Sequence, residues 1–411
     1  MSPPSVEAGA RPRVLVLNQY YWPGVEATAH LLAELCEALA DEFDVTVVTG
    51  MVAGADEAGR TEKDGVEIVR VGSTAYDRSR LSLRAANYLT YLGLSLWKGL
   101  KVERPDVVLC MTDPPVIADV ALLVARRFDV PLVVVSQDVF PEVAVALKRL
   151  DNPALVELLR LATRTYLKRA DRVVAIGDTM RERLVAKGAD GDRIVVIPNW
   201  TDTSDLEPRP RDNAWAREHG LVGKFVVMHS GNIGHAQDLD TLIRAATFLR
   251  DLDDLRIVLI GGGARRDELK ELAKLLEVEQ VAFMGYQPRE LLADSLSSAD
   301  IHVVGLARGL SGYVVPSRLY GVLAVARPVL AAAEADSETA KVIAQVGAGL
   351  VVPPGRPELL ARAIRQAHDG EHDLDELGRR GREWVAGEGD RQVAIGRYRE
   401  LLHEVTNGRR R

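Results

Sequence analysis

Val107-Val-Leu-Cys-Met111 and Leu132-Val-Val-Val135 lie on either side of an amphipathic stretch over residues 116–128. Both apolar runs are continuous, which is typical of strands in a parallel sheet that is covered on both faces. The stretch between them has the periodicity of a helix. Two parallel strands joined by a helix form a right-handed βαβ unit, so this region predicts an α/β protein with a doubly wound sheet.

The same alternation extends along the chain in both directions. In the first half, strands are expected at residues 14–17, 45–48, 107–111, 132–135, 173–176 and 194–197. In the second half, they are expected at residues 225–228, 256–260, 281–284, 301–304, 328–331 and 350–352. Helical patterns occupy the gaps between them, for example at residues 28–40, 240–250 and 267–276.

The alternation is interrupted near residue 200. Pro198-Asn-Trp200 ends the sixth expected strand, and residues 207–212 are polar and rich in proline, as is typical of a linker. We therefore expect two tandem Rossmann-like domains, residues 1–200 and 201–411, that face each other across a cleft. The last helix, about residues 390–408, is expected to cross back to the first domain. Open α/β sheets bind ligands at the carboxyl ends of their strands, so the candidate functional residues are those that follow strands.

The composition excludes several classes of protein. The 411 residues are 47% hydrophobic and 27% charged, and the net charge of −7 argues against a nucleic-acid binder with a wide basic surface. Cys36 and Cys110 lie in apolar runs without a CxxC neighbour, and the eight histidines form no HExxH motif, so we expect no disulfide framework and no metal site. Neither a secretory segment nor a stretch long enough to span a bilayer is visible, which favours a cytoplasmic location.

Two loops of the first domain carry candidate site residues. Gly24 stands at an expected strand-to-helix turn, where glycine lets a ligand approach the backbone and a helix start offers N–H groups to an anion. A plain turn is the alternative. Asp138 and Glu142 follow the strand at residues 132–135 and could orient a hydroxyl or stabilise a developing positive charge as catalytic groups. Helix capping by Asp138 and a solvated Glu142 are the alternative there.

Two further loops belong to the second domain. Gly231 and Asn232 follow the strand at residues 225–228 in a loop that could face a phosphate, although no Gly-Lys-Ser/Thr follows as in a Walker A motif. Ser317 and Arg318 come directly after Pro316, and a guanidinium beside a helix start suits a diphosphate. A surface arginine on an ordinary helix fits the second pattern equally well.

Seven segments, in order along essentially the whole chain, resemble the GT-B glycosyltransferases of glycosyltransferase family 4. The segments are Tyr20-Tyr-Trp-Pro-Gly24, Thr112-Asp-Pro-Pro115, Gln137-Asp-Val-Phe-Pro-Glu142, Ile197-Pro-Asn-Trp200, Ser230-Gly-Asn-Ile-Gly234, Val315-Pro-Ser-Arg318 and Arg327-Pro-Val329. The likeness is greatest to the branch that includes fucosyl- and N-acetylfucosaminyl-type transferases of bacterial exopolysaccharide and O-antigen assembly.

The resemblance implies a retaining transfer of a sugar from a nucleotide-diphosphate sugar, with a UDP-sugar favoured, to an acceptor held by the first domain. By the same likeness, Gly24 would approach the donor phosphates, and Asp138 would stand where many relatives place an active-site histidine. Ser317 and Arg318 would hold the diphosphate and neutralise the leaving group. Family enzymes of this fold need no bound metal, so no cofactor is expected.

The resemblance also implies which residues would bind the nucleotide base, and it shows where this chain differs from the family pattern. Gly285 and Tyr286 would receive the base, and Gly231 and Asn232 occupy the loop where relatives carry an arginine. Many relatives have two glutamates where this chain has Tyr313 and Gly321, and Gln237 lies near the position of a family lysine. Arg318 is expected to supply much of the missing positive charge. The missing acids leave two alternatives to a glycosyltransferase, a sugar-nucleotide epimerase of the same architecture and a non-catalytic sugar-nucleotide-binding subunit.

Residues 78–104 combine an apolar stretch with basic flanks. The basic residues are Arg78, Arg80, Arg84, Lys98, Lys101 and Arg104, and Tyr88, Tyr91 and Trp97 lie in the stretch between them. A basic, aromatic helix that is too short to span suits the surface of an anionic membrane, although a buried helix with charged ends fits the same pattern. The first interpretation places the protein at the inner face of the plasma membrane, where a glycan or polyprenyl-diphosphate-linked acceptor would be found.

Overall fold

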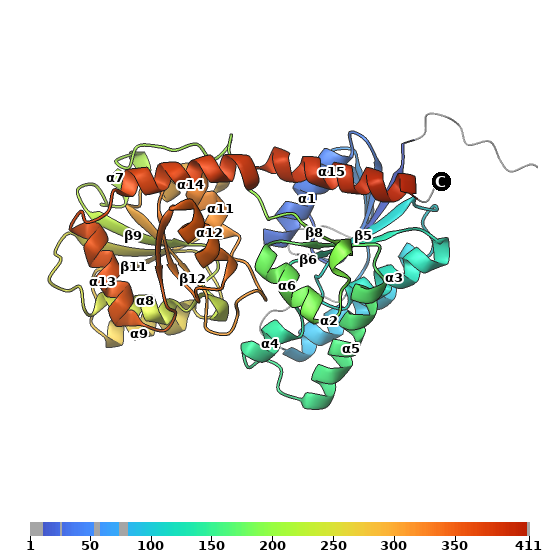
Figure 1. Ribbon diagram of the computed structural model, residues 1–411, viewed down its shortest axis with the longest axis horizontal. Coiled ribbons are helices and arrows are strands. Elements are labelled where there is room, and N and C mark those ends of the chain that lie inside the picture. The colour runs from blue at the N-terminus through green and yellow to red at the C-terminus, as the bar shows by residue number, and fades with distance from the viewer. Residues whose placement is uncertain (1–10, 25–26, 53–57, 74–80, 409–411) are drawn as a thin grey trace, which may run out of the picture.

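The computed structural model describes residues 11–24, 27–52, 58–73 and 81–408. Two α/β domains lie side by side, and helix α15 (Arg391–Gly408), at the end of the chain, lies over the first of them (Figure 1). Each domain is built around one mainly parallel sheet with helices on both faces. This architecture confirms the predicted fold class.

The first domain has the strand order β3-β4-β2-β1-β5-β6-β7-β8 within the described residues. The strands are β1 (Arg13–Leu17), β2 (Asp44–Thr49), β3 (Gly59–Lys63), β4 (Val66–Arg70), β5 (Val107–Met111), β6 (Leu132–Ser136), β7 (Arg172–Ala175) and β8 (Ile194–Val196). Alternate residues of β1 enter different cores: Val14 and Val16 pack on one face of the sheet and Leu15 and Leu17 on the other. Both faces are therefore buried, which explains the continuous apolar runs.

The hairpin β3–β4 is absent from the sequence prediction. Strand β3 is exposed and polar, and it pairs with β4 in the antiparallel direction at the edge of the sheet. Asp64 and Gly65, with φ of 50° and 76°, form the turn. An Asp-Gly pair between two short segments is a hairpin signal, but β3 carries no apolar run, so a search for buried strands passes over it.

The second domain has the strand order β11-β10-β9-β12-β13-β14 within the described residues. The strands are β9 (Phe225–Ser230), β10 (Leu255–Ile260), β11 (Val281–Met284), β12 (Ile301–Gly305), β13 (Val329–Ala332) and β14 (Gly349–Val352). This order is that of a doubly wound nucleotide-binding sheet, with the direction of winding reversed between β9 and β12.

Helices cover both sheets. In the first domain they are α1 (Ala27–Leu39), α2 (Leu81–Gly99), α3 (Ile117–Phe128), α4 (Glu142–Ala146), α5 (Pro153–Arg169) and α6 (Asp178–Ala186). In the second they are α7 (Ala214–Glu218), α8 (Leu239–Ala246), α9 (Arg266–Leu275), α10 (Leu292–Ser297), α11 (Arg318–Ala324), α12 (Glu338–Val346), α13 (Pro357–His368) and α14 (Leu374–Glu388). Helix α8 is shorter than predicted, because residues 247–250 form a turn.

The chain crosses between the domains twice, near Thr201 and near residues 389–391, and the two crossing segments are hydrogen-bonded to each other. The backbone N–H of Thr201 donates to Gly389 (3.0 Å), and the N–H of Arg391 donates to Thr201 (2.9 Å). Beyond this crossing, α15 buries Ile395, Tyr398 and Leu402 in the core of the first domain. The end of the chain is thus part of the first domain's packing, although it follows the second domain in sequence.

Candidate active site

Two glycine-rich loops of the second domain pack against each other beside the switch point between β9 and β12. A side chain on Gly261 would collide with the carbonyl oxygen of Gly231, and one on Gly263 would collide with that of Ile233. The N–H of Ile233 donates to the carbonyl of Gly262 (2.7 Å). The absence of side chains lets the two backbones touch, and it leaves their outer surface open to a ligand.

Arg318, the first residue of α11, lies against His229 of β9. Its Nη1 is 3.1 Å from both Nδ1 and Nε2 of the imidazole. Equal distances to the two nitrogens place Nη1 over the ring rather than in line with either lone pair. His229 is fully buried, and its Nε2 is 3.3 Å from the carbonyl oxygen of Asn232. The ring therefore supports both the guanidinium and the loop that carries Gly231.

The charge of Arg318 has no acidic partner among the described residues. Burial lowers the pKa of Arg318 to about 10, so the guanidinium is charged at neutral pH. Burial and the neighbouring Arg318 charge hold the pKa of His229 well below its usual range, so the ring is neutral. A desolvated cation without a counter-ion is costly unless an anion binds to it.

Tyr286 follows β11 and lies across the second glycine-rich loop. A side chain on Gly261 or Gly262 would lie 3.4 Å or 3.2 Å from its ring, and its hydroxyl donates to the Gly262 carbonyl (3.3 Å). The residue is 65% exposed, which leaves ring surface free for stacking. Gly285 beside it is also exposed. This geometry suits a nucleotide base next to the cation of Arg318.

Asp138 occupies the facing edge of the first domain, directly after β6. A hydrogen-bonded frame holds the preceding residue: Thr112 Oγ1 accepts from the Gln137 N–H (3.1 Å), and the side-chain amides of Gln137 and Asn199 bond to each other twice (3.2 and 3.0 Å). Gln137 and Asn199 are buried. Sequence reasoning gave Thr112 and Asn199 no role, although both lie in segments that resemble the family.

The carboxyl group of Asp138 titrates close to neutral pH. Its side chain is exposed where the two domains meet, but the surrounding protein desolvates it, and Asp113 adds a like charge. These effects raise its pKa to about 7. A carboxyl group with a pKa near the working pH can accept a proton or, when charged, stabilise positive charge in a reaction.

The backbone joins Asp138 to the second domain. Asp138 and Val314 form an isolated antiparallel bridge, and the N–H of Val139 donates to the carbonyl of Tyr313 (2.8 Å). Val314 belongs to the loop that continues to Ser317 and Arg318. The structure therefore brings Asp138 to the same loop as the candidate diphosphate residues.

Glu142 has different surroundings from Asp138. Its carboxylate accepts from Lys187 Nζ and from Arg160 Nε (3.2 Å), and Lys187 also donates to the Phe140 carbonyl (2.5 Å). Lys187 is buried, so Glu142 neutralises a desolvated cation and ties α4 to α5 and α6. The structure gives the two acids different partners, and we do not assign catalysis to Glu142.

The remaining predicted residues lie at the expected loops. Gly24 is buried in the turn before α1, and its N–H donates to the Tyr21 carbonyl (2.9 Å). Ser317 directly precedes α11, and its hydroxyl makes no capping bond. Asn232 is exposed beside Gly231.

The departures from the family pattern have structural uses. The Tyr313 ring packs under the Arg183 guanidinium, 5.0 Å from its centroid, and so contributes to the contact between the domains. A side chain on Gly321 would face Leu206 and Leu296, each 3.7 Å away. Gln237 Oε1 accepts from the Gly234 N–H (3.0 Å) and stiffens the first glycine-rich loop.

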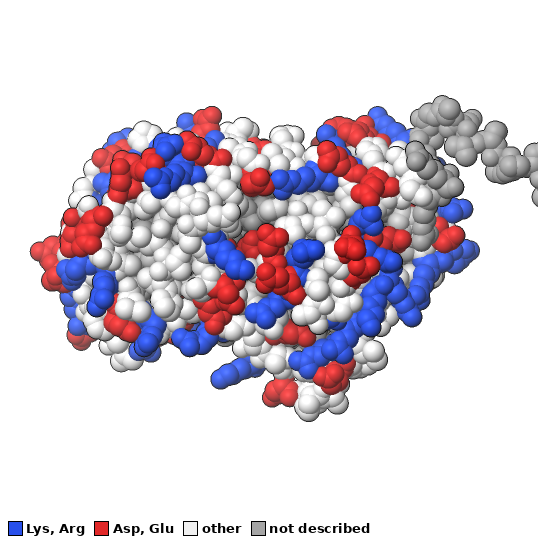
Figure 2. Space-filling view, in the orientation of Figure 1, with Lys and Arg blue, Asp and Glu red and all other residues white. Residues whose placement is uncertain are grey.

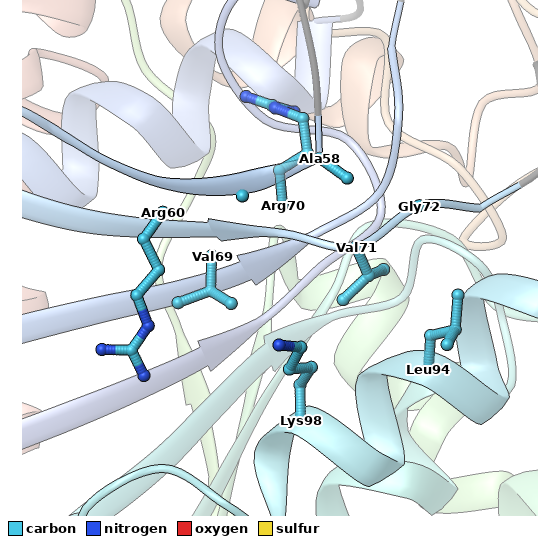
Figure 3. A pocket seen from close by; sticks show the side chains of 9 residues that line it. Ala58, Arg60, Val69, Arg70, Val71, Gly72, Leu94 and Lys98 are labelled. Carbon is cyan, nitrogen blue, oxygen red and sulfur yellow. The ribbon is translucent and has the colours of Figure 1, made fainter.

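Two cavities lie apart from this site. One of about 340 Å³ is lined by Val69, Leu94, Arg60 and Lys98, between the β3–β4 hairpin and α2 (Figure 3). Another of about 400 Å³ lies at the amino ends of β1 and β2. No residue of the glycine-rich loops lines either cavity. The described residues contain no group of three or more His, Cys, Asp or Glu side chains placed to hold a metal ion.

Comparison with known families gives the fold its name. Residues 24–200 match the family described as glycosyl transferase 4-like domain, and residues 212–384 match glycosyl transferases group 1. The chain is a glycosyltransferase of the GT-B fold. The first match covers the first sheet except β1, the second match covers the whole second sheet, and both the segment that joins them and α15 lie outside the matches.

Individual relatives of this glycosyltransferase are distant. The chain is 28% identical to the probable glycosyltransferase WbjE of Pseudomonas aeruginosa, over 89% of this chain and 91% of that protein. It is 29% identical to a putative colanic acid biosynthesis glycosyl transferase, WcaI of Escherichia coli, over 51% of this chain and 53% of that protein. Among solved structures, HepE of Anabaena in complex with UDP-glucose superposes with a TM-score of 0.71 at 16% identity, over 95% of this chain and 99% of HepE. The fucosyl-type subgroup is not distinguished by these matches.

Proposed function

We propose that this glycosyltransferase moves a sugar from a nucleotide-diphosphate sugar, with a UDP-sugar favoured, to an acceptor in the assembly of a cell-surface polysaccharide or glycolipid. The observation that carries the proposal is the cation of Arg318, desolvated and without an acidic partner among the described residues, beside Gly231 of the first glycine-rich loop. An anionic ligand supplies the missing counter-charge. The relatives support the proposed polysaccharide product and the proposed UDP-sugar donor, since WcaI is named for colanic acid biosynthesis and HepE holds UDP-glucose.

The proposed donor site follows from the second-domain loops. Arg318 and Ser317 hold the diphosphate, the Gly231–Asn232 loop approaches it, and Tyr286 receives the base. As the bond between the anomeric carbon and the diphosphate oxygen breaks, negative charge grows on that oxygen. Arg318 stabilises this charge more strongly in the transition state than in the bound donor, which lowers the barrier.

Asp138 acts on the acceptor side of the proposed site. The acceptor hydroxyl forms a bond to the anomeric carbon on the face that the diphosphate leaves, so the configuration is retained and the departing diphosphate carries away the bonding electron pair. Charged Asp138 orients the hydroxyl and stabilises the positive charge that develops on the sugar ring. The hydroxyl proton goes to the departing diphosphate, whose oxygen lies on the same face.

Charge neutralisation in this proposal is assigned to Arg318, so the enzyme is proposed to need no metal. We extend the proposal to the sugar: the likeness to the fucosyl- and N-acetylfucosaminyl-type branch favours a hexosyl or N-acetylhexosaminyl donor. We propose no nucleic-acid partner for this enzyme.

The acceptor is proposed to be lipid-linked, with the protein at the inner face of the plasma membrane. Helix α2 exposes Trp97, which is 49% exposed, and Lys98 and Lys101 lie 4.9 and 4.0 Å from its ring. Aromatic and basic side chains together suit a membrane interface. Arg78 and Arg80 lie outside the described residues. None of the described helices has the length and apolarity needed to cross a bilayer.

Thermal unfolding with UDP, GDP, ADP and dTDP, each with and without magnesium, tests the donor site. A nucleotide at about 100 times its dissociation constant stabilises the folded state by about 2.7 kcal/mol. We expect a clear response to UDP that is the same without magnesium, and its loss in Arg318→Ala. Arg362→Ala is the matched control, because Arg362 is exposed on α13, away from the loops. Silence across the panel would contradict the proposal.

A non-catalytic nucleotide-sugar-binding subunit is the second candidate. The positions of the two family glutamates are occupied by Tyr313, which contacts Arg183, and by Gly321, which carries no side chain. A protein of this kind would respond to UDP but would neither hydrolyse nor transfer from a UDP-sugar. Product analysis with a panel of UDP-sugars and acceptors separates the two candidates, and it also detects epimerisation, which needs no acceptor.

A further inference from the structure

Helix α5 has an unusual exposed face. Leu155, Leu158 and Leu161 are 42%, 62% and 63% exposed, and their spacing places them on one side of the first half of the helix. We call these three residues the leucine tip. The solvent face of a surface helix is normally polar, and grouped apolar side chains on it indicate an interaction surface.

Positive charge adjoins the leucine tip. Arg164, Lys168 and Arg169 are exposed on the second half of α5, and Arg126 and Arg127 are exposed at the end of α3, which packs beside α5. We call these five residues the basic band. Figure 2 shows blue side chains that run as a band over α5 and α3, above a protruding end of the first domain that is white with some red side chains.

The charges of the basic band are not compensated within the described residues. None of its members forms an ion pair with a described acid, whereas Arg160 on the same helix pairs with Glu157 (2.5 Å) and Glu142 (3.2 Å). The chain as a whole has a net charge of −7, so the band is a local concentration of positive charge. Its complement is a surface of negative charge.

We propose that the leucine tip and the basic band form a docking surface for an anionic lipid bilayer. The leucines insert at the boundary between headgroups and acyl chains, and the band lies on the lipid phosphates. The proposal rests on the proposed lipid-linked acceptor, but it adds α3 and α5 to α2 as the elements that touch the membrane. Leu123, 51% exposed on α3, lies on the element between them, since α3 packs against both α2 and α5.

This docking also orients the cleft. Residues 147–152 join α4 to α5, which carries the leucine tip. Val143 and Ala146 of α4 pack against the second-domain cluster of Leu306 and Leu310, which Val314 also contacts. Val314 bridges to Asp138. A membrane contact at α5 therefore holds Asp138, on the acceptor side of the proposed site, close to the bilayer, where a lipid-linked substrate lies.

Flotation of the full chain with vesicles of phosphatidylcholine, with and without phosphatidylglycerol, tests the proposal. We expect binding only to the vesicles that contain phosphatidylglycerol, and release at high salt because exposed charges are screened. Leu158→Asp with Leu161→Asp, and separately Arg164→Glu with Lys168→Glu, should each lower the bound fraction by about tenfold.

Helix α9 of the second domain offers matched controls. Leu275 is 79% exposed there, and Lys270 and Lys274 are exposed beside it. Leu275→Asp, and Lys270→Glu with Lys274→Glu, should bind vesicles like the wild type. A second readout needs no disruptive change: Leu158→Cys labelled with a polarity-sensitive fluorophore should shift to the blue on anionic vesicles, and Leu275→Cys should not. Cys36 and Cys110 are buried, so labelling is selective.

Wild-type protein that fails to bind anionic vesicles at low salt would overturn the proposal, and capture of a protein partner by α5 would then explain the leucine tip. Loss of binding in Trp97→Ala but not in either α5 variant would overturn it while leaving the proposed contact of α2 intact. Transfer to a water-soluble acceptor should persist in the α5 variants, so failure of docking and failure of the proposed chemistry are distinguished.

Discussion

Arg318 lies over the ring of His229, with Nη1 3.1 Å from each ring nitrogen. Because the imidazole is buried and neutral, it positions the guanidinium without neutralising it. The full positive charge remains available to an anion, because no described carboxylate pairs with the half-buried guanidinium. In the proposed donor site, this pair supplies the positive charge for the diphosphate.

Arg318→Ala should weaken binding of UDP by about 10- to 100-fold, because a charge-assisted hydrogen bond contributes about 1.5–3 kcal/mol. Arg318→Lys should recover part of the loss, since a lysine supplies the charge without the two-pronged geometry. Isothermal titration measures both, with Arg362→Ala as the control. Unchanged affinity in Arg318→Ala would place the diphosphate elsewhere.

His229→Phe should raise KM for the donor several-fold with a smaller change in kcat. Phenylalanine fills the buried site but loses the contact to the Asn232 carbonyl, worth about 1 kcal/mol, and so leaves Arg318 less well positioned. Steady-state kinetics on donor and acceptor separately check this. A fall in kcat alone, with normal donor KM, would contradict a positioning role.

Activity should rise with pH around an apparent pKa near 7, the value to which desolvation and Asp113 raise the pKa of Asp138. The reaction requires the charged form of Asp138, so the acid limb of the pH–rate profile rises toward alkaline pH. Asp138→Asn should abolish that limb and reduce kcat more than donor affinity. Asp113→Asn removes a like charge and should move the limb to lower pH. A pH–rate profile of the three proteins tests all of these expectations.

The raised pKa of Asp138 should also make the stability of the folded protein depend on pH. Its pKa is raised in the folded protein, so the folded state binds more protons than the unfolded state between about pH 4 and 7. Stability should therefore fall as pH rises through that window, and Asp138→Asn should be more stable than the wild type above pH 7. Chemical denaturation at several pH values measures this. Equal pH dependence in both proteins would show that the pKa of Asp138 is not raised.

Glu338→Ala should weaken the contact between the two domains. Glu338 Oε2, at the start of α12, accepts from the N–H (2.9 Å) and the hydroxyl (2.7 Å) of Thr179 in the first domain. Its loss removes about 1.5–3 kcal/mol of contact between the domains. We expect a larger radius of gyration by X-ray scattering and a higher KM for the acceptor. Glu383→Ala, whose described partner Arg379 is on the same helix, is the control.

The positions of most strands and the doubly wound fold class could be predicted from the chain alone. Continuous apolar runs such as residues 107–111 and 132–135 mark strands buried on both faces, because burial on both sides of a sheet leaves no position for a polar residue. Asp138 is a candidate because it follows such a strand, and Arg318 is one because it stands beside Pro316 at an expected helix start. The β3–β4 hairpin was missed, since its edge strand is exposed and polar.

The sequence by itself determined two Rossmann-like domains and most strands of their parallel sheets, because periodicity along the chain follows local burial. Only the tertiary structure decided which of those residues meet. It placed His229 under Arg318, joined Asp138 to Val314 across the domains, gave Glu142 to Lys187, and gathered the leucine tip and the basic band on one surface. These relationships depend on how distant elements pack, and no local pattern in the chain encodes the distance between two side chains that a fold brings together.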